Sequence, residues 1–167
     1  MDIVVNDTNI FLDLMSVGLL DISFELPIKF HTVDYVVAEI TDMEQKKQIM
    51  KLVETGKLYV KEFDEQEFGE IISLYQSRNN NVSVTDCSVW YYAKKNDFRL
   101  LTGDGKLRKS ATADGVIVSG IFYITDMLVE CNIVGKTDMA NILNSLRAIN
   151  KRLPQKIIDE RISNLLR

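Results

Sequence analysis

Four acidic residues in this sequence stand where carboxylates could act together on one substrate. Asp7 follows the apolar run IVVN and Asp104 follows the run RLLTG, whereas Glu39 and Asp86 fall in segments with a helical pattern. We expect the two runs to be parallel strands, and ligands gather beyond the carboxyl ends of such strands. Carboxylates that converge repel one another, so a cluster of them favours a positive charge in its midst.

The chemistry that suits these acids is that of a hard divalent cation. The chain has one histidine, His31, and two isolated cysteines, Cys87 and Cys131, which argues against a zinc site or a Ser-His-Asp site. Carboxylate oxygens without histidine or cysteine select Mg²⁺ or Mn²⁺. Such an ion activates water, stabilises charge on a phosphoryl oxygen and orients an in-line displacement.

Each acid also has a simpler explanation. Asp7 and Asp104 read equally well as solvated loop residues, and Glu39 as part of a solvated helical face. Asp86, in the first turn of its helix, could serve only to compensate the helix dipole. The functional interpretation therefore depends on the four side chains meeting in space.

The elements expected to position these acids alternate along the chain. Strands are predicted at 3–6, 28–33, 58–63, 99–104 and 116–120. Helices are predicted at 9–17, 34–43, 44–54, 66–76, 85–95, from 125 to 130, at 137–150 and at 154–166. The strands are short and apolar on both faces, as in a parallel sheet covered on both sides, so we expect an α/β fold.

Bulk properties indicate a soluble globular protein of 167 residues with a net charge of −4. No apolar run reaches the ~20 residues of a membrane span, and the N-terminus lacks a basic region before an apolar one, so we expect a cytoplasmic protein and no membrane partner. We expect one domain over 1–136 and a helical extension packed on it over 137–167. The apolar stripes of that extension either pack back on the domain or form a dimer or partner surface.

Three stretches resemble PIN domains over about residues 1–125. They are VVNDTNIFLDL at 4–14, DYVVAEI at 34–40, and VSVTDCSVWYYAKKNDFRLLTGDGKLRKSA at 82–111, the last being the most specific. The tail from Tyr123 onward resembles the C-terminal extension of the VapC-toxin-like branch of that nuclease superfamily.

The resemblance implies a three-layer α/β/α fold with a central parallel sheet and a Mg²⁺- or Mn²⁺-dependent endoribonuclease. It implies Asp7, Asp86 and Asp104 as metal ligands, with Glu39 completing the catalytic set or polarising the attacking water. Supporting hydrogen bonds are implied for Thr8, Asn9 and Thr102. The implied partners are RNA, an antitoxin protein and a second copy of the chain.

Basic residues near the acids provide candidate phosphate contacts, of which Lys106 and Arg108 are the preferred pair. Their neighbours are Lys94, Lys95 and Lys109, and an ordinary solvated surface is the alternative explanation. Other acids near these elements are left outside the candidate set: Asp13, Asp97, Asp114 and Asp126.

The sequence leaves three functions open. The leading hypothesis is a ribonuclease that is the toxin of a toxin–antitoxin pair. The alternative is a catalytically inactive PIN-like module that binds RNA or a protein. A receiver-type phosphotransfer domain is disfavoured, because no mid-chain strand ends in an aspartate at the expected place.

Overall fold

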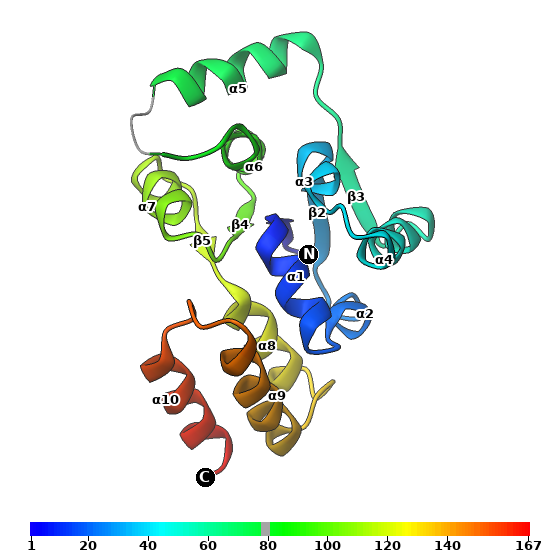
Figure 1. Cartoon of the computed structure of the whole chain (residues 1–167), viewed down its shortest axis with the longest axis vertical. Helices are drawn as coiled ribbons and strands as arrows, with labels where there is room; N and C mark the ends of the chain where they lie inside the picture. The colour runs from blue at the N-terminus through cyan, green and yellow to red at the C-terminus, as the bar shows by residue number, and fades with distance from the viewer. Residues whose placement is uncertain (78–80) are drawn as a thin grey trace. The chain divides into compact units, whose positions relative to one another are not determined.

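A parallel five-stranded sheet organises the first part of the fold, as seen in a computed structural model that describes residues 1–77 and 81–167. The strand order is β3-β2-β1-β4-β5, and Figure 1 labels β2, β3, β4 and β5. The strands are β1 (Ile3–Asn6), β2 (Lys29–Val33), β3 (Leu58–Lys61), β4 (Arg99–Leu101) and β5 (Val118–Ser119). The expected α/β fold with a central parallel sheet is confirmed.

Helices connect and cover these strands. They are α1 (Thr8–Ser16), α2 (Leu20–Ser23), α3 (Asp34–Glu39), α4 (Met43–Glu54), α5 (Glu65–Ser77), α6 (Val84–Asn96), α7 (Gly105–Ala113), α8 (Ile121–Glu130), α9 (Lys136–Ile149) and α10 (Gln155–Leu165). Two of them, α2 and α7, are absent from the elements expected from the sequence. The helix expected at 34–43 ends earlier, at Glu39, because Asp42 instead caps α4 by accepting a hydrogen bond from the Gln45 N–H.

The chain divides into two compact units. Unit 1 comprises Met1–Ile10 with Pro27–Gly120, and unit 2 comprises Phe11–Leu26 with Ile121–Arg167. This grouping follows spatial contacts and includes an N-terminal segment in unit 2, which a division by sequence position does not anticipate. The organisation expected from the sequence, 1–136 followed by an extension at 137–167, stays a prediction.

In unit 1, β1 is the central strand, and its neighbours β2 and β4 lie in parallel register on its two sides. Helix α6 packs against β1, β2 and β4, and α5 packs on α6 (Figure 1). The side chains of Val4, Val5, Leu100 and Leu101 are fully buried. These apolar runs hold the sheet in place, so the residues that follow β1 and β4 are fixed by the hydrophobic core.

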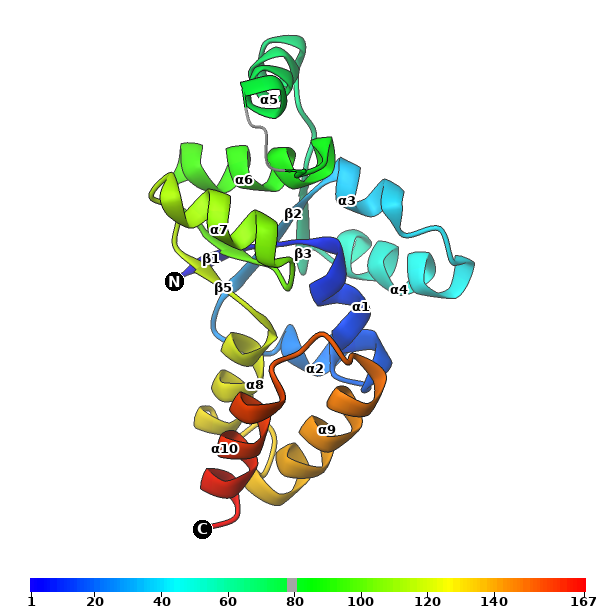
Figure 2. The same ribbon diagram turned by 60° about the vertical axis from the view of Figure 1, so that its left-hand side comes forward.

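Unit 2 is helical, and α9 packs against both α8 and α10 (Figure 2). Leu143, Leu146 and Ile158 are buried there. Polar contacts add specificity, because Asp13 accepts hydrogen bonds from the Asn150 side-chain amide at 3.1 Å on each of its two carboxylate oxygens. Across the described residues, the chain has no helix with both the length and the apolar character to span a membrane.

Arg161 joins α10 to α8 by two kinds of contact. Its guanidinium donates to Asp126 from Nε at 3.0 Å and from Nη2 at 2.8 Å, and it lies 4.5 Å from the centre of the Phe122 ring. We expect Arg161→Lys to lose the bidentate geometry and part of the stacking, lowering stability by about 1 kcal/mol. Hydrogen exchange should accelerate in residues 155–165 and not in the strands. Arg152→Lys, an exposed site, is the control, and equal exchange in α10 of the two variants would contradict the prediction.

Candidate active site

The sheet reverses its direction of growth between β1 and β4, and residues from both strand ends meet there. The N–H of Asp7 donates to the Leu101 carbonyl at 2.9 Å. The hydroxyl of the fully buried Thr102 donates to Asp7 Oδ2 at 2.7 Å and accepts from the Asp104 N–H at 3.1 Å. Thr102 therefore bridges Asp7 and Asp104, at the point where open α/β sheets bind ligands.

Asp7 is nearly inaccessible to water, with 4% of its surface exposed. Burial above all, and to a smaller extent the nearby charges of Asp86 and Glu39, raises the pKa of its carboxyl group from 3.8 to about 6. Hydrogen bonds from the Thr102 hydroxyl and from the Thr8 N–H oppose this rise, because they stabilise the ionised form. An ionised Asp7 is thus costly in this site unless a positive charge stands near it.

Asp104 begins α7 as its N-cap. One of its oxygens, Oδ1, accepts from the backbone N–H groups of Lys106 at 2.8 Å and Leu107 at 3.1 Å. Gly103 is held as well, because its N–H donates to the Asn9 side-chain oxygen at 2.9 Å. The carboxylate of Asp104 is therefore oriented by the first turn of a helix that follows the strand end directly.

Asp86 is oriented by a capping box at the start of α6. The Ser83 side chain accepts from the Asp86 N–H at 3.0 Å, and Asp86 Oδ2 accepts from the Ser83 N–H at 2.9 Å. Burial raises the pKa of the Asp86 carboxyl, the hydrogen bonds with Ser83 lower it, and the charges of Asp104 and Glu39 raise it. Ser83 is not among the residues selected from the sequence, although Ser-x-x-Asp is a recognisable helix-start signal.

Glu39 ends α3 and is exposed, and its Oε2 accepts from the Thr8 hydroxyl at 2.7 Å. Thr8 thus contacts two of the acids, since its N–H binds Asp7 Oδ1 at 2.8 Å. Thr8, Asn9 and Thr102 all make hydrogen bonds within this part of unit 1.

The four acids interact electrostatically in pairs. The charges of Asp86 and Glu39 raise the pKa of Asp7, and the charges of Asp104 and Glu39 raise the pKa of Asp86. In the ranges 1–77 and 81–167, no group of three or more His, Cys, Asp or Glu side chains already has the spacing of a metal site. The four acids are therefore neighbours at the carboxyl end of the sheet, and their charges influence one another.

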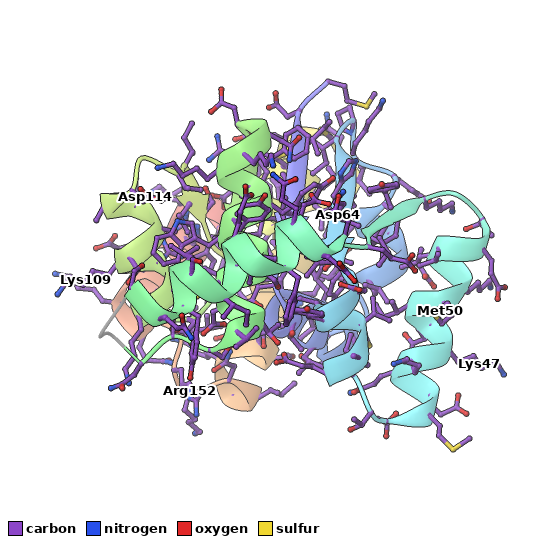
Figure 3. All side chains as sticks on the ribbon, turned by 90° about the horizontal axis from the view of Figure 1, so that it is seen from above. Lys47, Met50, Asp64, Lys109, Asp114 and Arg152 are labelled. Carbon is purple, nitrogen blue, oxygen red and sulfur yellow. The ribbon has the colours of Figure 1, made fainter. Side chains whose placement is uncertain are left out.

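The candidate basic residues differ in their contacts. Arg108 donates from Nη2 to the Thr102 carbonyl at 3.2 Å, and a Cβ at Gly120 would come within 2.8 Å of that nitrogen. Lys106 and Lys109 are exposed on α7, and Lys109 extends outward in Figure 3. Arg108 therefore lies beside the Thr102 bridge, in space that the absence of a side chain at Gly120 leaves open.

Lys94 and Lys95 line a separate groove of about 600 Å³ between α5 and α6. Lys94 pairs with Asp114, which also accepts from the Trp90 indole N–H at 2.9 Å. Lys95 forms an ion pair with Glu70 at 3.6 Å. These pairings favour a structural role for the two lysines.

The other acids left outside the candidate set have different surroundings. Asp13 bonds Asn150 and Asp126 bonds Arg161, both within unit 2. Asp97 ends α6 in a left-handed conformation, with φ of 56°.

A family model described as a PIN domain matches residues 3–166, which is nearly the whole chain. The chain belongs to the PIN-domain family. PIN domains form a nuclease superfamily whose members generally use divalent metals. No protein with a curated function matches the chain.

Solved structures resemble this PIN domain at low sequence identity. VapBC-1 from nontypeable Haemophilus influenzae has a TM-score of 0.52 and 18% identity, covering 72% of this chain and 98% of that chain. VapBC2 from Rickettsia felis, bound to a DNA fragment from their promoter, has a TM-score of 0.49 and 14% identity, covering 71% and 98%. Identity this low makes the likeness one of fold.

The donors of this PIN domain fit a hard divalent cation. They are carboxylates, and the burial that raises the pKa of Asp7 is the penalty that a bound cation would relieve. A backbone N–H holds one oxygen of each aspartate: Asp7 through Thr8, Asp86 through Ser83, and Asp104 through Lys106. The carboxylates are therefore oriented before any ligand arrives.

Asn6 is a second unusual feature beside Asp7. Its side chain is fully buried, and among the described residues neither its Nδ2 nor its Oδ1 has a hydrogen-bond partner. Leaving a buried polar group unpaired costs about 1–3 kcal/mol. The sequence gives no hint of this, because Asn6 reads there as the polar end of an apolar strand.

The raised pKa of Asp7 predicts an unusual pH dependence of stability. The folded PIN domain binds this proton more tightly than the unfolded chain, so stability falls as pH rises from about 4 to about 6 and stays lower above. In EDTA, we expect Asp7→Asn to raise the free energy of unfolding by about 1–3 kcal/mol at pH 7 and to have little effect near pH 4. Urea unfolding at both pH values tests this, with Asp2→Asn as the control. An equal gain at both pH values would contradict the assignment.

Replacing Asn6 tests whether its amide is unpaired in solution. We expect Asn6→Val to raise the free energy of unfolding by about 1–2 kcal/mol, because it removes two unsatisfied groups and suits a strand. Thermal and urea unfolding of the variant measure this. A loss of stability would show that the amide has a partner in solution.

Proposed function

We propose that this PIN domain is a Mg²⁺- or Mn²⁺-dependent endoribonuclease. The observation that carries the proposal is the electrostatic coupling of Asp7, Glu39, Asp86 and Asp104 at the carboxyl ends of β1 and β4. Asp7, Asp86 and Asp104 would hold the cation, and Glu39 would complete the catalytic set. When bound, the cation supplies Lewis-acid stabilisation of a phosphoryl oxygen and lowers the pKa of a water.

The chain's own residues contribute orientation and charge. Thr102 fixes the relative position of Asp7 and Asp104 through a single hydroxyl. Thr8 holds Glu39 beside Asp7, which places a carboxylate where it could orient an attacking water or accept its proton. Lys106 and Arg108, on the helix that Asp104 caps, are our candidates for contacts with RNA phosphates.

The biological setting that we propose is a toxin–antitoxin pair. The support is the resemblance of the sequence to the VapC-toxin-like branch and the fold shared with VapBC-1. In this setting the partners are RNA, an antitoxin protein and a second copy of the chain, and the compartment is the cytoplasm. Co-expression with the product of an adjacent gene, followed by mass measurement of the complex, would test the antitoxin.

The catalytic proposal is tested by substituting one carboxylate. We expect Asp104→Asn to lower Mg²⁺-dependent cleavage of single-stranded RNA by about 100-fold or more, since it removes a ligand charge. Manganese titration calorimetry should show weaker binding, and the melting temperature should confirm folding. Asp97→Asn, which also changes an acid to its amide near a helix end, is the control and should cleave normally.

Two results would contradict the proposal. Full activity of the Asp104→Asn variant would remove this carboxylate from the mechanism. A parent protein that binds RNA and does not cleave it in Mg²⁺ or Mn²⁺ would favour the alternative, an inactive RNA-binding module.

A further inference from the structure

Four aromatic side chains form a continuous cluster beside the acids, which we name the aromatic ledge: Tyr35, Phe63, Phe68 and Tyr91. The ring centre of Tyr35 lies 6.1 Å from that of Phe63 and 6.4 Å from that of Phe68. The rings of Phe63 and Tyr91 are 6.0 Å apart. All three pairs meet edge to face, and Phe68 is 44% exposed, while the other three rings are half-buried.

The ledge shares two helices with the candidate active site, because α3 carries Tyr35 and Glu39 and α6 carries Asp86 and Tyr91. Tyr35 and Glu39 are four residues apart on α3, so their side chains emerge on the same side of the helix. Phe63 comes two residues after β3 ends, at the same carboxyl edge of the sheet as Asp7. All these residues belong to unit 1. A flexible chain bound at the acids could therefore extend across the rings.

The charges around the ledge decide which part of such a chain it could hold. Exposed carboxylates border it at Glu62, Asp64 and Glu65, and Asp64 is labelled in Figure 3 beside the start of α5. They disfavour close contact with phosphates. The nearby cations are already engaged, since Lys61 pairs with Glu67 at 3.2 Å and Lys95 with Glu70 at 3.6 Å.

Resting on the proposed ribonuclease function, we propose that the aromatic ledge binds single-stranded RNA by stacking its bases next to the candidate active site. A base offers an aromatic face and no charge, so it suits rings within an acidic border. Stacking requires splayed bases, which double-stranded RNA does not offer.

A cationic protein segment is the other ligand that such a surface could attract. The ring positions that it would use are partly taken, because Lys61 Nζ lies 5.8 Å from the centre of the Phe63 ring and Lys95 Nζ lies 5.3 Å from that of Tyr91. These contacts, with the ion pairs to Glu67 and Glu70, occupy part of the ring faces and part of the carboxylate charge that a cationic segment would use. A base would stack instead on Phe68, the most exposed ring of the four.

The test compares two exposed rings on the same helix. Phe68 belongs to the ledge, whereas Tyr75, 43% exposed, lies outside it on α5. In an Asp7→Asn background that prevents cleavage, we expect Phe68→Ala to weaken binding of a fluorescent single-stranded RNA by about ten-fold. Tyr75→Ala should leave the affinity unchanged, and Phe68→Trp should retain it. An RNA of equal length with abasic residues should bind the Phe68→Ala protein and its parent equally.

Each remaining outcome decides the question. Equal affinities of Phe68→Ala and its parent for the base-containing RNA would overturn the ledge, and so would equal losses in Phe68→Ala and Tyr75→Ala. If Phe68→Ala weakens only the complex with a protein partner, the occupant is that partner and the proposal is wrong. Cleavage is measured separately, in proteins that keep Asp7. If these do not cleave RNA but Phe68→Ala still weakens RNA binding, the proposed function fails and the proposal for the aromatic ledge stands. Circular dichroism and melting temperatures confirm that each variant folds.

Discussion

The burial of the Asp7 carboxylate is the constraint on which the arrangement of the site depends. Asp7 follows the central strand, where apolar neighbours exclude water. That burial and the nearby acids disfavour the ionised form of its carboxyl group. The fold answers with hydrogen bonds from Thr102 and Thr8, which stabilise the ionised form and fix its orientation. The remaining imbalance is what makes a cation the natural complement of this edge.

The acidic character of the chain shapes how it could hold a nucleic acid. With a net charge of −4 and several lysines already paired, broad electrostatic attraction for RNA is weak. The proposed cation offsets the acids only locally. Stacking on exposed rings is a source of affinity that does not require a basic surface, and the aromatic ledge provides it beside Glu39.

Sequence patterns predicted the elements whose apolar runs are long enough to be read locally. The strands before Asp7 and Asp104 are of this kind, and so are the long helices α5, α6, α9 and α10. Helix α7 is not predicted from the sequence, because its residues, GKLRKSATA, begin with glycine and include few apolar ones, although Asp104 is a typical N-cap.

Other features depend on tertiary contacts that no local pattern encodes. The aromatic ledge gathers rings from residues 35 to 91, which are widely separated in sequence. The grouping of Phe11–Leu26 with the C-terminal helices is likewise set by packing. The pairing of Asp104 with Asp7 through one hydroxyl depends on the register of β1 against β4. Strand ends indicate which acids are neighbours, and only the fold shows what connects them.

The double position of Asp104, as candidate ligand and as the cap of α7, links two properties that are usually separate. Its carboxylate charge stabilises the positive end of the helix dipole while its Oδ1 holds the first-turn N–H groups. Any ligand that binds the Asp104 carboxylate alters the free energy of the first turn of α7. By reciprocity, the order of that turn alters the affinity for the ligand. Protection of the amides of residues 105–113 from hydrogen exchange therefore reports whether the candidate active site is occupied.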